Sequence, residues 1–269
     1  MEPDLIYDVG AHRGEDTEFY LKKGFRVFGV EANPALHQYL QTRFAGHVSD
    51  GRLRLANCAV AAENGPITFY SNTSATVWGT TSPEWVARNT RLGTQSIATT
   101  VQGRRFDELL RDNGIPYYMK VDIEGADLLC LEALHHSREK PKYVSIESSI
   151  TSWSELLREF AILRNLGYRR FKIVNQLEVP SQVPPSPARE GQYATHAFPD
   201  GATGLFGEEA PGKWLSEREA INAYRRIFIE YRLFGNDGIL STFNWKRPLI
   251  WRLERFLPRR KWHDTHAAL

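Results

Sequence analysis

The chain has 269 residues, of which 42% are hydrophobic, 25% charged and 12% aromatic. This is the composition of a folded globular protein, and it excludes a disordered, collagen-like or coiled-coil chain. The 34 basic and 32 acidic residues leave a net charge of only +2, so the overall charge predicts no nucleic-acid partner. The two cysteines, Cys58 and Cys130, are too few for a disulfide framework or a zinc cluster and fit a reducing compartment.

The N-terminal residues show no signal for export. They contain neither a basic region nor an apolar stretch of about 7 to 15 residues, and nowhere do about 18 apolar residues run together. We therefore expect a cytoplasmic protein rather than a secreted or membrane-spanning one. Because the first expected strand begins at Leu5, we also expect no N-terminal domain that could cover an active site.

Short apolar runs alternate with amphipathic segments from Leu5 to about Asn175. This alternation is the pattern of βαβ units around a mostly parallel sheet, so residues 1–175 are predicted to form an α/β core. The expected strands are residues 5–10, 26–31, 53–60, 117–123 and 143–147. Helix starts are indicated near Glu15, at Asn33 with Pro34, at Ser152 with Glu155, and at Ser216 with Glu219.

Two segments interrupt the alternation. Residues 71–100 are rich in Ser, Thr, Asn and Gly, so we expect a surface insertion without sheet elements. Residues 180–215 carry many prolines and glycines, which excludes a regular element and exceeds the usual loop length. We expect residues 176–269 to form a lid or acceptor-binding region within the same globule.

The first strand leads into the turn Asp8-Val-Gly-Ala-His-Arg-Gly14, just before a helix begins. A glycine-bearing turn between a strand and a helix N-terminus lets the backbone approach a nucleotide-like ligand closely. Its G-x-x-x-G spacing differs from the G-x-G-x-x-G of dinucleotide-binding folds, which makes a nicotinamide oxidoreductase a distant alternative. The second strand ends in Glu31, where a carboxylate can accept hydrogen bonds from ribose hydroxyls.

Acidic residues at both strand ends suit a cationic ligand that has no phosphates, and S-adenosylmethionine fits that description. Its ribose would meet Glu31, its amino-acid part and sulfonium would lie near the glycine turn, and its adenine would meet the segment after Asn57. The residues expected to bind this cofactor are Asp8, Gly10, Ala11, His12, Gly14, Thr17, Glu31, Ala32, Asn33, Asn57, Cys58, Ala59 and Asp122.

The core contains several short motifs that point to a known family. They are Asp8-Val-Gly-Ala-x-x-Gly14, Val30-Glu-Ala-Asn-Pro34, Asn57-Cys-Ala-Val60, Phe106-Asp-Glu-Leu109, Lys120-Val-Asp-Ile-Glu-Gly125 and Ile146-Glu147. Over about residues 5–175 the sequence resembles the FkbM family of methyltransferases, most specifically in the run from Lys120. The resemblance implies a class I, S-adenosylmethionine-dependent methyltransferase with a Rossmann-like fold and a mostly parallel seven-stranded sheet in the order 3-2-1-4-5-7-6, with helices on both faces. It also implies methylation of hydroxyl groups, on natural-product or sugar acceptors. One departure is His12, where many members have asparagine, which argues against His12 as a catalytic base.

Three carboxylates, Asp122, Glu124 and Glu147, are expected at the carboxyl ends of adjacent strands, where open α/β sheets bind ligands. Because a sugar or alkyl hydroxyl is barely acidic, a base placed there can accept its proton during methyl transfer, and we predict these three as catalytic. Clustered carboxylates repel one another unless one is protonated, paired with Lys120 or bound to a divalent cation, so a role for Mg²⁺ stays open. For Glu124, offsetting a helix dipole near Gly125 is the alternative role.

Basic and aromatic residues alternate in residues 245–261. This pattern is typical either of an amphipathic helix at a membrane surface or of a terminal helix packed on the core, so peripheral contact with the inner membrane surface is one expectation. Residues 262–266 could fold back and offer His263, Asp264 or His266 to the pocket, although we expect a frayed terminus there.

Together these features predict a cytoplasmic, S-adenosylmethionine-dependent O-methyltransferase that acts on a hydroxyl of a sugar or glycoconjugate. Two alternatives remain: methylation of a small natural product or an amine, and a noncatalytic nucleoside-binding module anchored by its basic tail. The expected partner is a small-molecule or glycan acceptor, and no motif identifies it.

Overall fold

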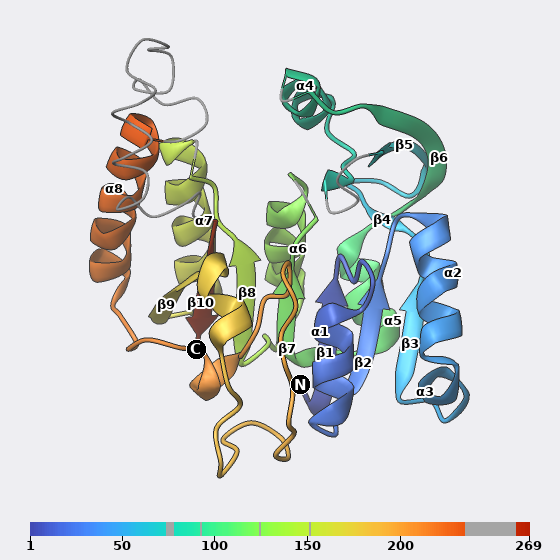
Figure 1. Cartoon of the computed structure of the whole chain (residues 1–269), viewed down its shortest axis with the longest axis horizontal. Coiled ribbons are helices and arrows are strands. Elements are labelled where there is room, and N and C mark those ends of the chain that lie inside the picture. The colour runs from blue at the N-terminus through green and yellow to red at the C-terminus, as the bar shows by residue number, and fades with distance from the viewer. Residues whose placement is uncertain (74–77, 92, 124, 151, 235–261) are drawn as a thin grey trace.

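The computed structural model describes residues 1–269 except 74–77, 92, 124, 151 and 235–261. In this part of the chain the central sheet consists of β1 (Glu2–Val9), β2 (Arg26–Val30), β3 (Leu53–Ala56), β7 (Pro116–Val121), β8 (Tyr143–Glu147), β9 (Arg170–Asn175) and β10 (His263–Ala268). The strands lie in the order β3-β2-β1-β7-β8-β10-β9, and only β10 pairs antiparallel with its neighbours (Figure 1). Numbered along the chain, this is the expected order 3-2-1-4-5-7-6 of a class I methyltransferase.

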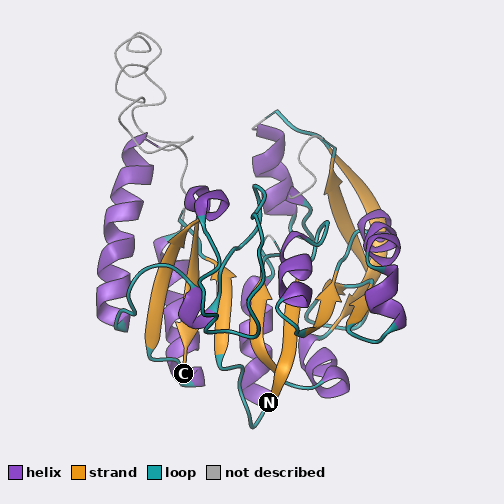
Figure 2. Ribbon diagram, turned by 60° about the horizontal axis from the view of Figure 1, so that its bottom comes forward, coloured by secondary structure: helices purple, strands orange, loops and turns teal. Residues whose placement is uncertain are grey.

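Helices cover both faces of the sheet, because successive strand side chains point to opposite faces (Figure 2). On one face Tyr7 and Val9 pack with residues of the helices α5 (Phe106–Asn113), α6 (Asp127–Ala133), α7 (Trp153–Leu166) and α8 (Glu217–Phe234). On the other face Ile6 packs with residues of α1 (Glu15–Lys22) and of α2 (Pro34–Arg43), which is followed by the short α3 (Ala45–Ser49). The sequence-predicted N-caps are confirmed, since the side chains of Asn33 and Ser152 accept hydrogen bonds from the backbone at the starts of α2 and α7.

The insertion contains a second sheet, so the prediction that residues 71–100 lack sheet elements is wrong. Strands β4 (Ala59–Val60), β5 (Gly65–Asn72) and β6 (Ser96–Arg104) pair in the order β4-β6-β5, and α4 (Pro83–Arg91) lies between β5 and β6 in the chain. Most of β6 is exposed and polar, as in Thr99 and Thr100, which suits an antiparallel strand with a solvated face. In the sequence, the same Ser and Thr residues are typical of a loop, so they do not predict this strand.

A long segment, residues 182–215, which we call the covering loop, lies over the sheet face that α1 also covers. It has no regular element apart from the short 3₁₀ turn η4 (Gly207–Glu209), as its prolines predict, and it buries Phe206 completely. Lys23, which directly follows α1, forms a buried ion pair of 2.9 Å with Glu209. Asp16 accepts a hydrogen bond of 3.0 Å from the backbone N–H of Thr203. The loop therefore takes the place of helices on this part of the sheet.

The strand β10 corrects the expectation of a frayed end at residues 262–266. It lies inside the sheet, where Asp264 pairs with Glu147 of β8 and His266 pairs with Lys172 of β9. All six of its residues are buried. The sequence His-Asp-Thr-His-Ala-Ala has no β-branched alternation that would predict a strand, and its position comes from the sheet that surrounds it. The C-terminal region thus contributes a strand to the core sheet.

Hydrogen bonds tie β10 to the helices on one face. The hydroxyl of Ser148 donates to Glu159 of α7 (2.8 Å) and lies 2.5 Å from the hydroxyl of Thr265. The same Thr265 hydroxyl lies 2.8 Å from that of Tyr224 on α8. Burial raises the pKa of Glu159 to about 8, while the hydrogen bonds from Ser148 and Thr265 oppose that rise. The carboxyl group is therefore held largely neutral at neutral pH.

This raised pKa predicts a pH-dependent stability. Between the ordinary carboxyl pKa and pH 8 the unfolded chain has lost the Glu159 proton and the folded chain keeps it, so rising pH favours unfolding. The free energy of unfolding should therefore fall by up to about 1.4 kcal/mol per pH unit in this range, and we expect Glu159→Gln to remove this fall. Urea unfolding of both proteins at several values from pH 5 to 8.5 measures it, and parallel curves for the two proteins would contradict the assignment.

The basic and aromatic segment 245–261 lies outside the described residues. Among the helices that the structure describes, none combines the length and the apolar character needed to span a membrane.

Candidate cofactor and acceptor cavities

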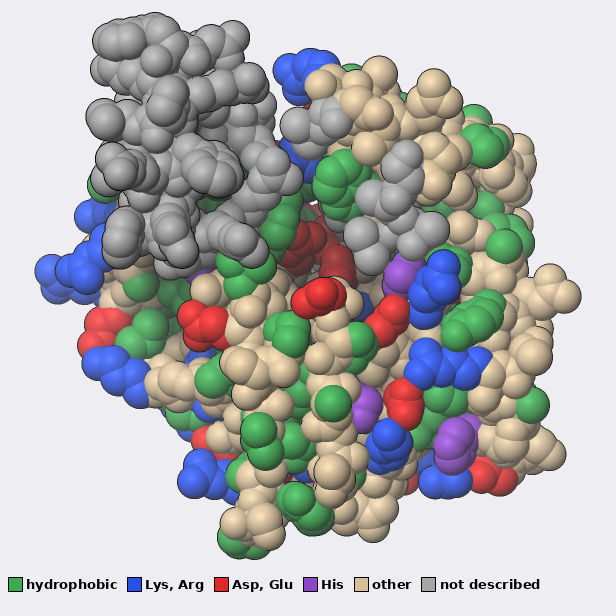
Figure 3. Space-filling view, in the orientation of Figure 1, with side chains coloured by type: hydrophobic (Ala, Val, Ile, Leu, Met, Phe, Trp, Pro, Cys, Tyr) green, Lys and Arg blue, Asp and Glu red, His purple; other side chains and the backbone are tan. Residues whose placement is uncertain are grey.

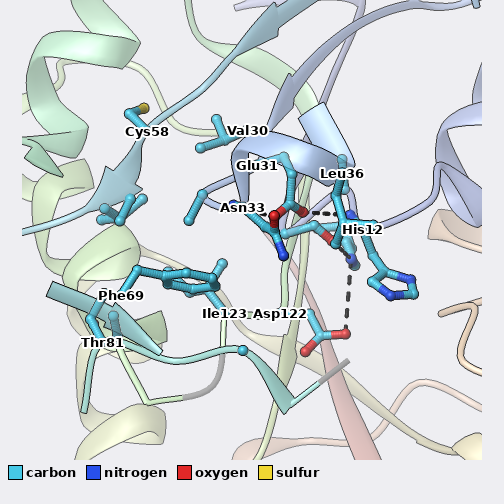
Figure 4. Close-up of a pocket in the computed structure, with 18 of the residues that line it drawn as sticks. His12, Val30, Glu31, Asn33, Leu36, Cys58, Phe69, Thr81, Asp122 and Ile123 are labelled. Carbon is cyan, nitrogen blue, oxygen red and sulfur yellow. Dashed lines mark hydrogen bonds and ion pairs between the residues drawn. The ribbon is translucent and has the colours of Figure 1, made fainter. Parts of the chain in front are cut away.

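A cavity, which we call the cofactor cavity, lies at the carboxyl ends of β1, β2 and β7, with residues of the insertion on its other side (Figure 4). Most of the residues predicted to bind a cofactor line it: Gly10, Ala11, His12, Glu31, Ala32, Asn33, Cys58, Ala59 and Asp122. The other lining residues are not predicted from the sequence: Glu15, Asp16, Val30, Leu36, Val60, Phe69, Gly79, Thr81, Lys120, Ile123, Ala126 and Gly201. Phe69 comes from β5, Thr81 from the insertion and Gly201 from the covering loop, where no local pattern marks them.

The carboxylate of Glu31 is held from both sides at the end of the second strand. One oxygen accepts a hydrogen bond from the backbone N–H of His12 (2.8 Å) and the other from that of Asn33 (2.8 Å). The side chain of Asn57 donates to the carbonyl oxygen of Glu31 (2.8 Å), so Asn57 supports the strand end without lining the cavity. Burial raises the pKa of Glu31 to about 7, against the lowering effect of the two backbone donors. A buried acceptor fixed at the end of the second strand is what a ribose requires.

Three other predicted cofactor residues, Asp8, Gly14 and Thr17, also lie outside the cavity lining. The hydroxyl of Thr17 donates to the carboxylate of Asp8 (2.5 Å), and both side chains are buried. Gly14 caps α1 with a φ of +81°, and a Cβ there would lie 2.4 Å from the ring of Phe44. These three residues hold the glycine turn in place from behind.

Lys120 stands at the centre of a buried cluster below the glycine turn. Its ammonium donates to the carbonyl oxygen of Gly10 (2.8 Å) and lies 3.3 Å from Asp8, 3.9 Å from Asp122 and 4.0 Å from Asp16. Burial by itself lowers the pKa of Lys120, but the three carboxylates outweigh it and raise the pKa above its usual value. Burial also raises the pKa of Asp16, while Lys120 opposes this. The lysine is therefore a permanent positive charge that holds the turn and the strand-end acids together.

Gly10 has a geometric reason to be glycine. Its φ is +85°, and a Cβ would lie 1.9 Å from the carbonyl oxygen of Asp122. The first and fourth strands of the chain's main sheet thus approach each other at this point more closely than any side chain allows. This contact brings Asp122 to the cofactor cavity.

The predicted catalytic residues are distributed over two adjoining cavities. Asp122 lines the cofactor cavity with 39% of its side chain exposed. Glu147 lines a second cavity, and Ala126 lines both. Glu124 lies outside the described residues. Among the residues that the structure does describe, no group of three or more His, Cys, Asp or Glu side chains is placed to hold a metal ion.

The cofactor cavity fits the chemistry of S-adenosylmethionine. It offers a buried carboxylate, the backbone of a glycine turn, and apolar surface from Val30, Cys58 and Phe69 that suits a planar base. Figure 4 shows the Phe69 ring and Thr81 on one side of this space, with Val30 and Glu31 on the other. The insertion therefore completes the site that the sheet begins.

Removal of the Glu31 carboxylate should weaken cofactor binding. In Glu31→Ala the ribose hydroxyls lose their acceptor, so we expect the affinity for S-adenosylhomocysteine to fall by about 1 to 3 kcal/mol. Calorimetric titration measures it. Glu63→Ala, at an exposed acid that lines neither cavity, is the control. An affinity equal to that of the unmodified protein would show that Glu31 does not hold the ribose.

Comparisons with known proteins agree with this geometry. The family model described as the methyltransferase FkbM domain matches residues 8–170. Solved structures with partial similarity include a SAM-dependent methyltransferase from Archaeoglobus fulgidus, with 13% identity over 98% of this chain and 86% of that chain at a TM-score of 0.39. A second is a SAM-dependent methyltransferase from Geobacter sulfurreducens in complex with S-adenosyl-L-homocysteine, with 10% identity over 100% and 85% of the two chains at a TM-score of 0.37.

A third is the precorrin-6y C5,15-methyltransferase from Geobacter metallireducens, with 14% identity over 64% of this chain and 67% of that chain at a TM-score of 0.37. No curated protein matches the sequence significantly. The FkbM family model covers more than half of the chain. The chain therefore belongs to the FkbM methyltransferase family and is an S-adenosylmethionine-dependent methyltransferase.

Proposed function

We propose that the protein transfers a methyl group to a hydroxyl of a sugar or glycoconjugate. The observation that carries this proposal is the placement of Asp122 and Glu147 in two adjoining cavities, one suited to the cofactor and the other open to an acceptor. A hydroxyl acceptor needs a group that takes up its proton, and carboxylates at this sheet edge supply it. Methylation of a small natural product or an amine is the second candidate, since an amine can attack without such a base.

Different residues of the chain would bind the cofactor and accept the proton of the acceptor. When bound, S-adenosylmethionine supplies an activated methyl group. Glu31 would accept hydrogen bonds from the ribose, the turn from Gly10 to Gly14 would border the amino-acid part, and residues 58–60 with Phe69 would border the adenine. Asp122 or Glu147 would take up the proton of the acceptor hydroxyl during methyl transfer and release it to water. The rest of the rate acceleration comes from holding the methyl group and the acceptor hydroxyl in a reactive orientation in the two cavities.

The first experiment is calorimetric titration of the purified protein with S-adenosylhomocysteine, with NADH titrated in parallel and each repeated with Mg²⁺ and with EDTA. We expect binding of S-adenosylhomocysteine alone. Transfer of labelled methyl from S-adenosylmethionine to candidate acceptors then tests the reaction, and mass spectrometry locates the methyl group on oxygen or nitrogen. Methylation on nitrogen would replace our proposal by the amine alternative, and cofactor binding with no transfer to any acceptor would favour a noncatalytic binding module.

A further inference from the structure

The second cavity, which we call the acceptor cavity, adjoins the cofactor cavity, because Ala126 lines both of them. Its other walls come from distant parts of the chain. They are the insertion, the start of α6, the end of β8 with the residues after it, one side of α7, and Trp262 directly ahead of β10. A molecule bound in this cavity lies beside the space that suits the methyl donor.

Two tryptophans line the acceptor cavity, Trp85 of α4 and Trp262. The guanidinium of Arg88, one helical turn after Trp85, lies over the ring of Trp85 (4.8 Å) and over that of Trp262 (5.3 Å). These cation–π contacts join the two indoles, which come from opposite ends of the chain's C-terminal two thirds, into one aromatic edge. The aromatic edge is therefore a product of the tertiary structure.

Trp85 is fixed where the two cavities meet. Gly125 has a φ of +102°, and a Cβ there would lie 2.7 Å from the indole nitrogen of Trp85. A larger residue at this position would displace the indole. The next residue is Ala126, which lines both cavities, so the indole of Trp85 lies close to their junction.

The rest of the acceptor cavity is rich in side chains that form hydrogen bonds. They include carboxylates and hydroxyls, among them Ser82, Glu84, Glu147, Ser149 and Glu155. Figure 3 shows acidic side chains in the hollow at the centre of the molecule, with hydrophobic side chains beside them. The acceptor cavity thus combines an aromatic edge with many groups that can bond to hydroxyls.

A pyranose ring presents the matching two kinds of surface. Its rim carries hydroxyls, whereas the C–H groups on one side of the ring form an apolar patch with a partial positive charge. The face of an indole carries the negative part of the ring quadrupole, so it attracts such C–H groups. An open-chain polyol has the same hydroxyls but no rigid apolar face. A planar aromatic acceptor has the face but too few hydroxyls for the polar lining.

We propose that the acceptor is a pyranose ring that stacks on Trp85 in the acceptor cavity, with Trp262 completing the aromatic edge. Trp85 is then a specificity-determining residue, which selects closed sugar rings that have an open C–H face. This inference rests on the proposed O-methylation of a sugar and narrows its substrate class.

The first test compares closed rings with open chains. Methyl glycopyranosides of the common hexoses and deoxyhexoses, and the alditols of the same sugars, are incubated with the protein and S-adenosylmethionine labelled in the methyl group. We expect label in at least one pyranoside and in no alditol. Equal labelling of a pyranoside and its alditol would overturn the stack on Trp85 and leave O-methylation of a sugar standing. Label in none of these sugars counts against both.

A matched set of variants tests the role of Trp85. With the pyranoside that is methylated best, Trp85→Ala should raise KM about 10- to 100-fold, the effect of removing one aromatic stacking partner, and leave kcat nearly unchanged. Trp85→Phe keeps an aromatic face and should restore most of the loss. Trp214→Ala removes another half-buried indole, which lines neither cavity, and should leave KM unchanged. An equal KM for Trp85→Ala and Trp214→Ala would refute the assignment.

A spectroscopic measurement on the unmodified protein makes the test independent of the stability of the variants. In protein labelled with 5-fluorotryptophan, the fluorine NMR signal that disappears in Trp85→Phe belongs to Trp85. The same pyranoside should shift this signal and leave the signal of Trp214 in place. A Trp85 signal that does not move at saturating pyranoside would show that the ring does not stack there.

Discussion

Asp122→Asn should lower kcat by about 100- to 10,000-fold, the contribution of a positioned proton acceptor to such reactions. Asparagine has the shape of aspartate and keeps one hydrogen-bond acceptor, but it cannot take up the proton of an acceptor hydroxyl. Asp122 lines the cofactor cavity beside Ala126, where the acceptor cavity begins. Steady-state kinetics with labelled S-adenosylmethionine measures the loss, and titration with S-adenosylhomocysteine measures the affinity of the same variant.

The two readouts divide the possible roles. A large loss in kcat with a much smaller loss in affinity assigns Asp122 to proton transfer. Equal losses in kcat and in affinity would instead assign Asp122 to cofactor binding, since it lines the cofactor cavity. The corresponding variant Glu147→Gln shows which of the two carboxylates accepts the proton, since only the acceptor should show the larger loss.

Lys120→Met should destabilise the folded protein by about 3 to 5 kcal/mol, because it leaves buried carboxylates without their counter-charge. Lys120 is 4% exposed, and Asp8 and Asp16 beside it are 1% and 3% exposed. The variant also removes the hydrogen bond to the carbonyl oxygen of Gly10, so the glycine turn should loosen as well. The loss should shrink at pH 5, because burial raises the pKa of Asp16 to about 7, so this carboxyl group is protonated in the folded state there and needs no counter-charge. Urea unfolding followed by circular dichroism at pH 7.5 and pH 5 measures it.

Two further variants isolate the charge effect. Lys22→Met removes a 44% exposed lysine that pairs with Glu18 on the surface of α1, and it should cost less than about 1 kcal/mol. Lys120→Met combined with Asp8→Asn removes one unpaired carboxylate while Thr17 keeps a hydrogen-bond partner, so part of the stability should return. A loss for Lys120→Met no larger than that for Lys22→Met would mean that the cluster is not held by the lysine.

Much of the sheet could be predicted from local sequence, for identifiable reasons. Strands β1, β2, β7 and β8 are apolar runs buried on both faces, and such runs stand out in any sequence. The caps at Asn33 and Ser152 act within three residues of their partners, so their pattern is local too. Glu31 was recognisable because a strand end and a turn define its position. Each of these features depends on neighbours in sequence.

The features that were missed depend on neighbours in space. Phe69 and Thr81 reach the cofactor cavity only because β5 and β6 pair into a second sheet. The polar sequences of these strands do not predict that sheet. Asp16 reads as an ordinary acid in the first turn of a helix, yet Lys120 and the covering loop enclose it. The acceptor cavity is lined by residues as far apart in the sequence as Ser82 and Trp262, and no local sequence pattern predicts that they come together.

The position of β10 has a consequence for how the molecule is made. During synthesis β8 and β9 leave the ribosome long before the strand that lies between them, which follows α8 and the segment 235–261. Until β10 arrives, the nascent sheet holds an open slot whose flanking backbone groups have no strand to pair with. Closing that slot requires contacts of high sequence separation, which are slow to form and expose the chain to wrong pairings while it waits. The central sheet therefore cannot close between β8 and β9 until residues 263–268 have been synthesised.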